Sequence, residues 1–418
     1  MREMKESGVK WIGTIPMNWE IDNPKYHFQQ RKERAAQGMT QLTASQKHGV
    51  ITQTEYMEKT GANIVTVQKD FDILKLVCAG DFVIHMRSFQ GGLEYSEKTG
   101  SISSAYVMLI PCETIKEPRY YKWFFKSSNY IDALSSTSNL VRDGQAMRWA
   151  NFIQLPIAIP PADEQKRIAD YLDKKCAEID ALVGNIQSQI DTMEQYKRSV
   201  VKETVTNGLN MDADVKDSGI QWIGTIPSHW ECIRGKYLLK YIQKPVHTDD
   251  GVITCFRDGE VTLRSNRRED GFTVADKEIG YQGIDVGDLV VHGMDGFAGA
   301  VGISDSRGKA SPVLNVLETD QNKRYIMYFL RSMAYSDVFL AMATGIRVRS
   351  CDLRWNKLAE LFYPVPPLEE QNAIVEHIDA VIQKANNIIA QKKEQLAVLD
   401  EYKKSLIYEY VTGKKEVV

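Results

Sequence analysis

The strongest pattern along the chain is a pair of apolar stripes whose members recur every three or four residues. Such spacing is typical of a helix that buries one narrow face, as in a coiled-coil seam. The first stripe comprises Ile168, Leu172, Cys176, Ile179, Val183, Ile186, Ile190 and Met193, with Tyr196 and Val200 beyond it. The second comprises Ile374, Ile378, Val381, Ala385, Ile388, Leu396, Leu399, Tyr402 and Leu406. Each stripe predicts a helix of roughly 40 residues, about 60 Å long at ~1.5 Å per residue.

Shorter patterns before each stripe predict mixed α/β domains. Residues 82–86 and 105–110 are rich in β-branched and aromatic side chains, as strands are. Glycines punctuate the chain between them as turns, and residues 120–125 begin a short amphipathic pattern. Residues 287–292 repeat the strand at 80–85. We therefore expect one such domain over residues 1–160 and a second over residues 210–366.

The chain also repeats its own motifs. Residues 7–20 (SGVKWIGTIPMNWE) and 218–231 (SGIQWIGTIPSHWE) agree at ten of fourteen positions. A proline pair followed by Glu164–Gln165 opens the first long helix, and a proline pair followed by Glu370–Gln371 opens the second. Both openings suit a helix start and its dipole. The period is too long for a solenoid. The repeat predicts two copies of one plan, related by an internal pseudo-twofold, that bind a nearly two-fold target.

The connection after the first helix favours an antiparallel helix pair. Residues 207–217 span at most ~40 Å when extended, so the second domain begins beside the end of the first helix. A parallel pair spanned by the body of the second domain is the alternative. The expected fold class is α+β, with two mixed α/β domains joined by two long helices (161–209 and 367–418) that form an antiparallel coiled coil.

Composition narrows the class of protein. The net charge of −3 is unusual for a lone non-specific DNA binder, so a nucleic-acid role must rest on local basic patches or on basic partners. No apolar run reaches the ~18 residues of a membrane span, and the charged N-terminus lacks a signal-peptide core. The six cysteines are scattered without a CxxC pair, which favours free thiols in the cytoplasm.

No catalytic motif accompanies these patterns. Adenine methylation would need a glycine-rich cofactor loop and an NPPF- or DPPY-type loop, whereas both Pro–Pro pairs here open helices. Residues 302–310 resemble a phosphate loop, but the spacing is one residue too long and Ala310 replaces the required Ser or Thr. The seven histidines show no HxxxH pairing. The chain is expected to be non-catalytic alone and to bind no cofactor or metal.

The paired WIGxIPxxW openings, the PPxxEQ-type helix starts and the order of two domains and two helices resemble the specificity subunit of type I restriction–modification systems. The resemblance covers essentially the whole chain. It implies that each globular domain is a target-recognition domain for one half of a split double-stranded DNA sequence, with the helices setting the spacing. It implies as partners two methyltransferase subunits that methylate adenine with S-adenosylmethionine, and restriction subunits that use ATP and Mg. No membrane partner is expected.

DNA reading uses Arg, Lys, Asn and Gln on base edges, with cations on phosphates. In the first domain the candidates follow the repeated strand or precede the proline-rich exit: His85, Arg87, Ser88, Gln90, Lys98, Ser103, Arg142 and Gln145. In the second they are Arg264, Asn266, Arg267, Arg268, His292, Asp295, Arg347 and Arg349. A solvated or salt-bridged surface role is the competing interpretation for each, and a core role for the two histidines. Arg148 and Arg354 recur beside Trp149 and Trp355, which favours packing or partner binding.

Two alternatives stay open. A free-standing DNA-binding or decoy protein derived from this family would bind specifically without partners. A coiled-coil scaffold without a nucleic-acid role would form no DNA-dependent complex. The tryptophans of the opening motifs, Trp11, Trp19, Trp222 and Trp230, are interpreted as structural, with methyltransferase docking as the rival.

Overall fold

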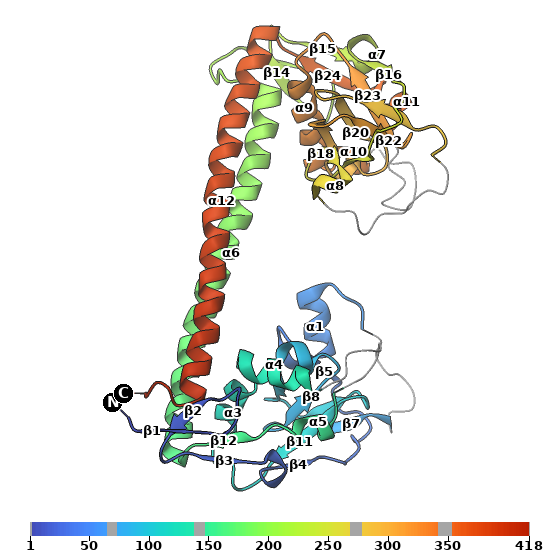
Figure 1. The fold of residues 1–418 in the computed structure, drawn as a ribbon. Coiled ribbons are helices and arrows are strands. Elements are labelled where there is room, and N and C mark those ends of the chain that lie inside the picture. Colours follow the sequence, from blue (N-terminus) through green and yellow to red (C-terminus); the bar gives the residue numbers. More distant parts are fainter. Residues whose placement is uncertain (1, 65–72, 138–146, 268–277, 342–352, 418) are drawn as a thin grey trace. The chain divides into compact units, whose positions relative to one another are not determined.

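The computed structural model describes residues 2–64, 73–137, 147–267, 278–341 and 353–417. The chain forms two compact units (Figure 1). Unit 1 comprises Met1–Ile186 and Glu394–Val418, and unit 2 comprises Gln187–Lys393. Each unit therefore combines a globular part with the start of one long helix and the end of the other.

Unit 1 is built around a four-stranded antiparallel sheet in the order β4-β11-β8-β9. Its strands are β1 (Met4–Glu6), β2 (Thr14–Pro16), β3 (Glu20–Asp22), β4 (Phe28–Gln30), β5 (Leu42–Ser45), β6 (Gly49–Thr52), β7 (Lys75–Val77), β8 (Phe82–Ile84), β9 (Glu94–Tyr95), β10 (Gly100–Ile102), β11 (Val107–Pro111) and β12 (Ile157–Ile159). Its short helices are η1 (Pro24–Tyr26), α1 (Gln53–Thr60), α2 (Ser88–Gly91), α3 (Pro118–Phe124), α4 (Ser128–Ser136) and α5 (Trp149–Phe152). The strands predicted at 82–86 and 105–110 are β8 and β11, with bounds within two residues.

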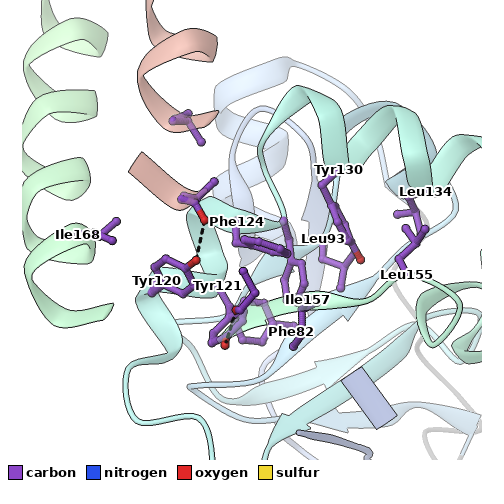
Figure 2. Packing of buried hydrophobic residues seen from close by; sticks show 14 of the residues in the cluster. Phe82, Leu93, Tyr120, Tyr121, Phe124, Tyr130, Leu134, Leu155, Ile157 and Ile168 are labelled. Atoms are coloured by element: carbon purple, nitrogen blue, oxygen red, sulfur yellow. Dashed lines mark hydrogen bonds between the residues drawn. The ribbon is translucent and has the colours of Figure 1, made fainter. Parts of the chain in front are cut away.

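Aromatic side chains fill the core of unit 1 (Figure 2). The ring of Phe28, on the edge strand β4, lies 5.5–5.7 Å from those of Phe82, Tyr121, Phe125 and Phe152. Edge-to-face pairs of this kind contribute roughly 0.5–1.5 kcal/mol each beyond the burial of area. The amphipathic pattern predicted at 120–125 thus packs the rings of Tyr121 and Phe125 against Phe28 of the sheet.

Unit 2 repeats the architecture, with a four-stranded antiparallel sheet in the order β16-β23-β20-β21. Its strands are β13 (Val215–Asp217), β14 (Thr225–Pro227), β15 (Glu231–Arg234), β16 (Lys240–Ile242), β17 (Ile253–Cys255), β18 (Val261–Leu263), β19 (Gln282–Ile284), β20 (Leu289–His292), β21 (Val301–Ile303), β22 (Gly308–Ala310), β23 (Leu314–Glu318) and β24 (Phe362–Val365). Its short helices are α7 (Gly235–Leu238), α8 (Arg264–Arg267), η3 (Gly296–Ala298), α9 (Lys323–Tyr335), α10 (Val338–Ala341) and α11 (Trp355–Leu358). Each two-stranded ladder of unit 1 also has its counterpart in unit 2, for example β5–β6 in β17–β18.

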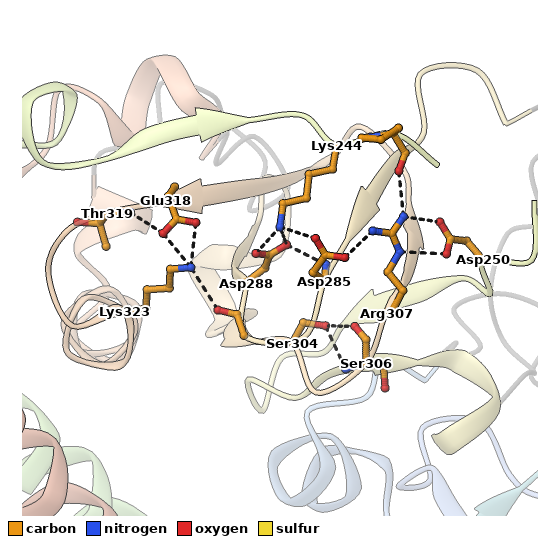
Figure 3. A network of polar contacts seen from close by, with 12 residues as sticks. Lys244, Asp250, Asp285, Asp288, Ser304, Ser306, Arg307, Glu318, Thr319 and Lys323 are labelled. Atoms are coloured by element: carbon orange, nitrogen blue, oxygen red, sulfur yellow. Dashed lines mark hydrogen bonds and ion pairs between the residues drawn. The ribbon is translucent and has the colours of Figure 1, made fainter. Parts of the chain in front are cut away.

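Polar contacts repeat along with the strands. Asp81 of unit 1 accepts hydrogen bonds from Arg31, at 2.6 Å, and from the backbone N–H three residues before it. Asp288 of unit 2 accepts the same pair of bonds, from Lys244 at 2.7 Å and from the N–H of Asp285 (Figure 3). The duplication is therefore one of hydrogen bonding as well as of sequence.

The two long helices are α6 (Ala162–Asn207) and α12 (Leu368–Val411), and they run antiparallel within each unit. In unit 1, Asp180 pairs with Lys403 at 2.5 Å, while the ring of Tyr171 lies 4.5 Å from that of Tyr410. In unit 2, Lys197 donates to Asn386 at 2.8 Å and Lys392 donates to Gln189. In both units, residues further along α6 meet residues earlier in α12. The antiparallel pair is therefore confirmed, and the parallel alternative is wrong.

The buried stripe of the helices departs from the sequence prediction at three places. Ile388 is 40% exposed and Ile389 is buried instead, while Tyr402 and Tyr196 are about half exposed. The reason is the helix repeat, because a step of four from the buried Ala385 stays on the seam whereas a step of three turns away from it. The remaining members from Ile168 to Ile190 line the seam as predicted, with Val183 only partly buried.

The two repeated motifs bind each other in both units. Trp19, from the first opening motif, is fully buried, and its indole N–H donates to Glu164 of the helix start at 2.8 Å. Trp230 is equally buried and donates to Glu370 at 3.1 Å. The structural interpretation of these two tryptophans therefore rests on a specific acceptor, whereas Trp222 is 38% exposed.

Two further contacts connect each globular part to the helix pair. The amide of Gln165 donates to the carbonyl of Pro160 in unit 1, as Gln371 does to Pro366 in unit 2. The hydroxyl of Tyr120 donates to the carbonyl of Val411 at the end of α12 (Figure 2). In unit 2 the hydroxyl of Tyr325 donates to the carbonyl of Val205 near the end of α6. We call the Trp–Glu, Gln–Pro and Tyr–Val contacts together the repeated anchor. It holds each globular part against one helix start and one helix end.

Candidate nucleic-acid interface

Four of the residues predicted to contact DNA lie together in unit 2. They line one cleft of about 660 Å³ beside the β17–β18 hairpin, which we call the unit 2 cleft. These residues are Arg264, Arg267, His292 and Asp295. The hairpin, α8 and the end of β20 bring them together, although up to 31 residues separate them in sequence. The cleft is thus a candidate surface for base edges.

Local hydrogen bonds fix the polar side chains of this cleft. Arg264 begins α8 directly after β18, and its Nε donates to the hydroxyl of Thr254 on the neighbouring strand at 3.0 Å. Asn266, which is exposed and is not among the residues that line the cleft, donates to the hydroxyl of Thr262 at 3.0 Å. The hydrogen bond at Nε orients the planar guanidinium of Arg264 within the cleft.

Arg267 is more strongly engaged than its position in a cationic run suggests. Its guanidinium pairs with Asp258 at 2.7 Å and with Glu260 at 2.8 Å, and lies 4.1 Å from the ring of Phe256. The hydrogen bond to Asp258 raises the pKa of Arg267. Two carboxylates offset its charge, so Arg267 is better suited to a directed base contact than to attracting phosphate.

Arg257 lies in the same cleft but was not among the residues predicted from the sequence. Its guanidinium is 62% exposed and pairs with Asp295 at 2.8 Å. Asp295 is itself placed by the imidazole of His292, whose Nδ1 accepts the backbone N–H of Asp295 at 3.0 Å. Burial lowers the pKa of His292, which favours the neutral ring that this contact needs. The signal that could have pointed to Arg257 in the sequence is its place as a lone arginine in the turn between β17 and β18.

The candidates of unit 1 are less concentrated. His85 and Ser88 are buried, where the Ser88 hydroxyl accepts the N–H of His85 at 2.9 Å and the imidazole lies 3.5 Å from the buried Glu94. Their side chains hold the turn and do not reach the surface. Arg87 and Gln90 are exposed beside them, while Lys98 pairs with Glu55 at 2.6 Å. Ser103 is partly buried and accepts the N–H of Ala105.

The β5–β6 hairpin and α1 of unit 1 correspond to the β17–β18 hairpin and α8 of unit 2. None of the predicted DNA-contact residues lies within residues 42–60. Five predicted residues lie outside the described part of the chain, namely Arg142, Gln145, Arg268, Arg347 and Arg349. The set of DNA-contact residues stays a prediction.

Arg148 and Arg354 precede the short helices α5 and α11, so the two recur at the same structural position. Within the described residues, no group of three or more His, Cys, Asp or Glu side chains is arranged to hold a metal ion. Burial raises the pKa of the Cys255 thiol to about 12, so the one thiol in the unit 2 cleft stays protonated at neutral pH. No helix in the described ranges combines the length and apolarity of a membrane span.

The fold is shared with a solved chain from the type I R-M system. That chain, from a structural study of the system's complex assembly and conformational transition, matches with a TM-score of 0.66 at 14% identity. The match covers 96% of this chain and 99% of the other. The architecture inferred from the sequence, two mixed α/β domains with two long helices, is confirmed.

The curated relatives that match this chain are specificity subunits of type I restriction enzymes. The type I restriction enzyme MjaVIII specificity subunit of Methanocaldococcus jannaschii is 22% identical over 82% of this chain and 80% of its own length. A second protein of that organism, assigned as the MjaX specificity subunit, is 22% identical over 97% of this chain and 96% of its own length. The EcoBI specificity subunit of Escherichia coli is 24% identical over 72% of this chain. No protein-family model matches. The whole-length resemblance to type I specificity subunits is confirmed.

Proposed function

We propose that this chain is the DNA-recognition subunit of a type I restriction–modification complex. Each globular part binds one half of a bipartite, asymmetric DNA sequence, and the helix pair sets the spacing between the halves. The chain directs adenine methylation and restriction that are carried out by other subunits. It has no catalytic role of its own.

The observation that carries the proposal is the contrast between what repeats and what differs. The repeated anchor and the strand order recur in both units, whereas the surfaces around the two hairpins do not. In unit 2 the hairpin is followed by the arginines of α8, and in unit 1 by the uncharged start of α1 with Gln53 and Thr54. One support with two different surfaces is what an asymmetric, two-part sequence requires, because base contacts must differ between the halves.

The proposed partners follow from the same contrast. Two copies of one methyltransferase subunit would each meet an equivalent part of the support. S-adenosylmethionine belongs to these subunits, and ATP with Mg to restriction subunits. A net charge of −3 also favours a complex in which basic partners supply part of the phosphate contacts.

The test is to express the full chain with the methyltransferase encoded beside it and to map methylated adenines across the host DNA. We expect a split sequence with a fixed gap, and its loss when this chain is deleted. Specific binding by the chain alone, with no co-purifying methyltransferase, would replace the proposal with the decoy alternative. Methylation that is unchanged without the chain, together with the absence of a DNA-dependent complex, would favour the scaffold alternative.

A further inference from the structure

A groove that recurs in both units lies between a long helix and the globular part. In unit 2 it has a volume of about 800 Å³. Its walls are α6, the turn of the β17–β18 hairpin and α9, and we call it the unit 2 helix groove. In unit 1 a groove of about 530 Å³ lies between α12, the turn of the β5–β6 hairpin and the region of α3. We call this one the unit 1 helix groove.

The helix side of the two grooves corresponds position by position. The unit 2 groove takes from α6 the residues Glu194, Lys197, Arg198 and Val201. The unit 1 groove takes from α12 the residues Asp400, Lys403, Lys404 and Ile407. Each pair is separated by 206 residues and keeps its chemical class, as an acid, a lysine, a second cation and a β-branched side chain. Both grooves are therefore built from the same part of the repeat.

The opposite wall also corresponds. Tyr328 and Arg331 line the unit 2 helix groove, and Trp123 and Lys126 line that of unit 1, with 205 residues between the members of each pair. The hairpin turn supplies another cation in each case, which is Arg257 in unit 2 and a lysine in unit 1. A cation thus stands on every wall of both grooves, although the hairpin turns otherwise differ in sequence.

Aromatic rings and carboxylates hold the groove cations in place, as where Lys404 pairs with Asp400 at 2.7 Å and Glu401 at 2.9 Å. Arg198 and Arg331 lie 5.1 Å and 5.6 Å from the ring of Tyr335, and Arg331 also donates to its hydroxyl. Among the described residues, the contact of Arg198 is with this ring and not with a carboxylate. The unit 1 groove is lined by six lysines against three carboxylates, and five of these lysines have carboxylate partners: Lys98, Lys122, Lys126, Lys403 and Lys404. In a chain whose net charge is −3, the linings of both grooves carry more cations than carboxylates.

We infer that the two helix grooves bind the sugar–phosphate backbone of the DNA. The inference rests on the proposed function and adds a site to it. A ligand that meets the same residues in both units must itself be the same at both units, as the DNA backbone is at both halves of a bipartite site and as two copies of one methyltransferase subunit are. Base edges differ between the halves, which agrees with the divergence of the residues outside these positions.

Adjacency to the predicted base contacts favours DNA over an acidic segment of a partner protein. Arg257 and Asp258 line both the unit 2 cleft and the unit 2 helix groove. In unit 1, Lys98 lines the groove, and Gln46 at its edge donates to the carbonyl of Arg87. A duplex that enters the cleft therefore places its backbone toward the groove in the same unit.

The test compares two double variants of the full chain in complex with its methyltransferase, by duplex binding across a salt series. Arg198→Ala with Lys404→Ala removes one cation from each groove. Lys202→Ala with Lys174→Ala removes two exposed lysines of α6 that line neither groove. We expect the groove variant to bind both target and non-target duplex more weakly, and its log–log salt slope to fall by about 2, at ~0.9 per lost phosphate contact. The control should keep the wild-type slope.

Two outcomes overturn the inference. One is a groove variant whose salt slope equals that of the control. The other is loss of co-purifying methyltransferase with an unchanged slope, which would assign the grooves to a partner protein. The variant Arg198→Lys with Lys404→Arg keeps the charges and is expected to keep the slope. A wild-type complex without any sequence preference would contradict the proposed function. Its salt slope on any duplex, compared with that of the groove variant, would still test the role of the grooves.

Discussion

Replacing Glu164 or Glu370 by Ala tests how the opening motif holds the helix start in each unit. Glu164 is 8% exposed, accepts the indole N–H of Trp19 and pairs with Arg2. Glu370 accepts the indole N–H of Trp230 but is 25% exposed. The two substitutions remove the same group from equivalent contacts that differ mainly in access to water.

The expected cost follows from these contacts. Glu164→Ala leaves a fully buried indole N–H without an acceptor, which costs ~1–3 kcal/mol. It also removes a negative charge from the first turn of α6, worth about 0.3–1 kcal/mol. The loss is therefore roughly 1.5–4 kcal/mol of unfolding free energy in unit 1. Water can replace the more exposed carboxylate of Glu370, so Glu370→Ala is expected to cost about 1–2 kcal/mol.

Urea unfolding of the full chain, followed by circular dichroism, measures both losses from the shift in midpoint and the slope. Glu164→Gln keeps an acceptor for Trp19 and is expected to cost less than half as much as Glu164→Ala. A Gln variant as destabilising as the Ala variant would refute the hydrogen-bond argument. A larger loss for Glu370→Ala than for Glu164→Ala would refute the argument from burial.

Three further predictions follow from single contacts. The hydrogen bond from Arg307 lowers the pKa of Asp250 to about 2, so this carboxylate stabilises unit 2 above its ordinary pKa near ~4, and the contribution is lost as the pH falls toward 2 (Figure 3). Arg307→Ala should return the NMR titration of Asp250 to the ordinary range, and an unchanged midpoint would contradict the assignment. Gly413→Ala, at a φ of +69° with side chains within 3.0 Å of the new Cβ, should lower the melting temperature more than Gly8→Ala, at +72° with open space around it; equal shifts would contradict the close packing. Arg267→Ala should relax base preference at one half-site only. Equal loss at both halves in methylation mapping would contradict the prediction that Arg267 contacts the half-site bound by unit 2.

The helices were the most predictable part of the fold, because each apolar stripe extends over many turns. The exceptions are local. The predicted stripe advances three residues from Ala385 to Ile388, whereas the buried residue is Ile389, four residues after Ala385. The internal repeat predicted the duplication, and the structure adds its physical content. Trp19 and Glu164 lie 145 residues apart in sequence, and only the fold shows that the two repeated motifs bind each other.

The candidate site was less predictable for two reasons. A core role and a DNA contact were both open for His85, and only the fold shows that its imidazole faces inward, 3.5 Å from Glu94 of a later strand. Arg267 appears in the sequence as part of a cationic run, but the hairpin folds Asp258 and Glu260 against it. Pairing across a turn decides which cations keep free donors, and composition does not contain that information.

The central claim is that two different DNA-contacting surfaces are mounted on one repeated support. It is tested most directly by replacing residues 218–366 with a second copy of residues 7–160 and mapping methylated adenines. The equivalent anchors at Trp19 and Trp230 make the exchange compatible with the fold. We expect the chimaera to direct methylation to a site in which the first half-sequence occurs twice and the second is absent. A folded chimaera that still directs methylation to the original asymmetric site would contradict the account.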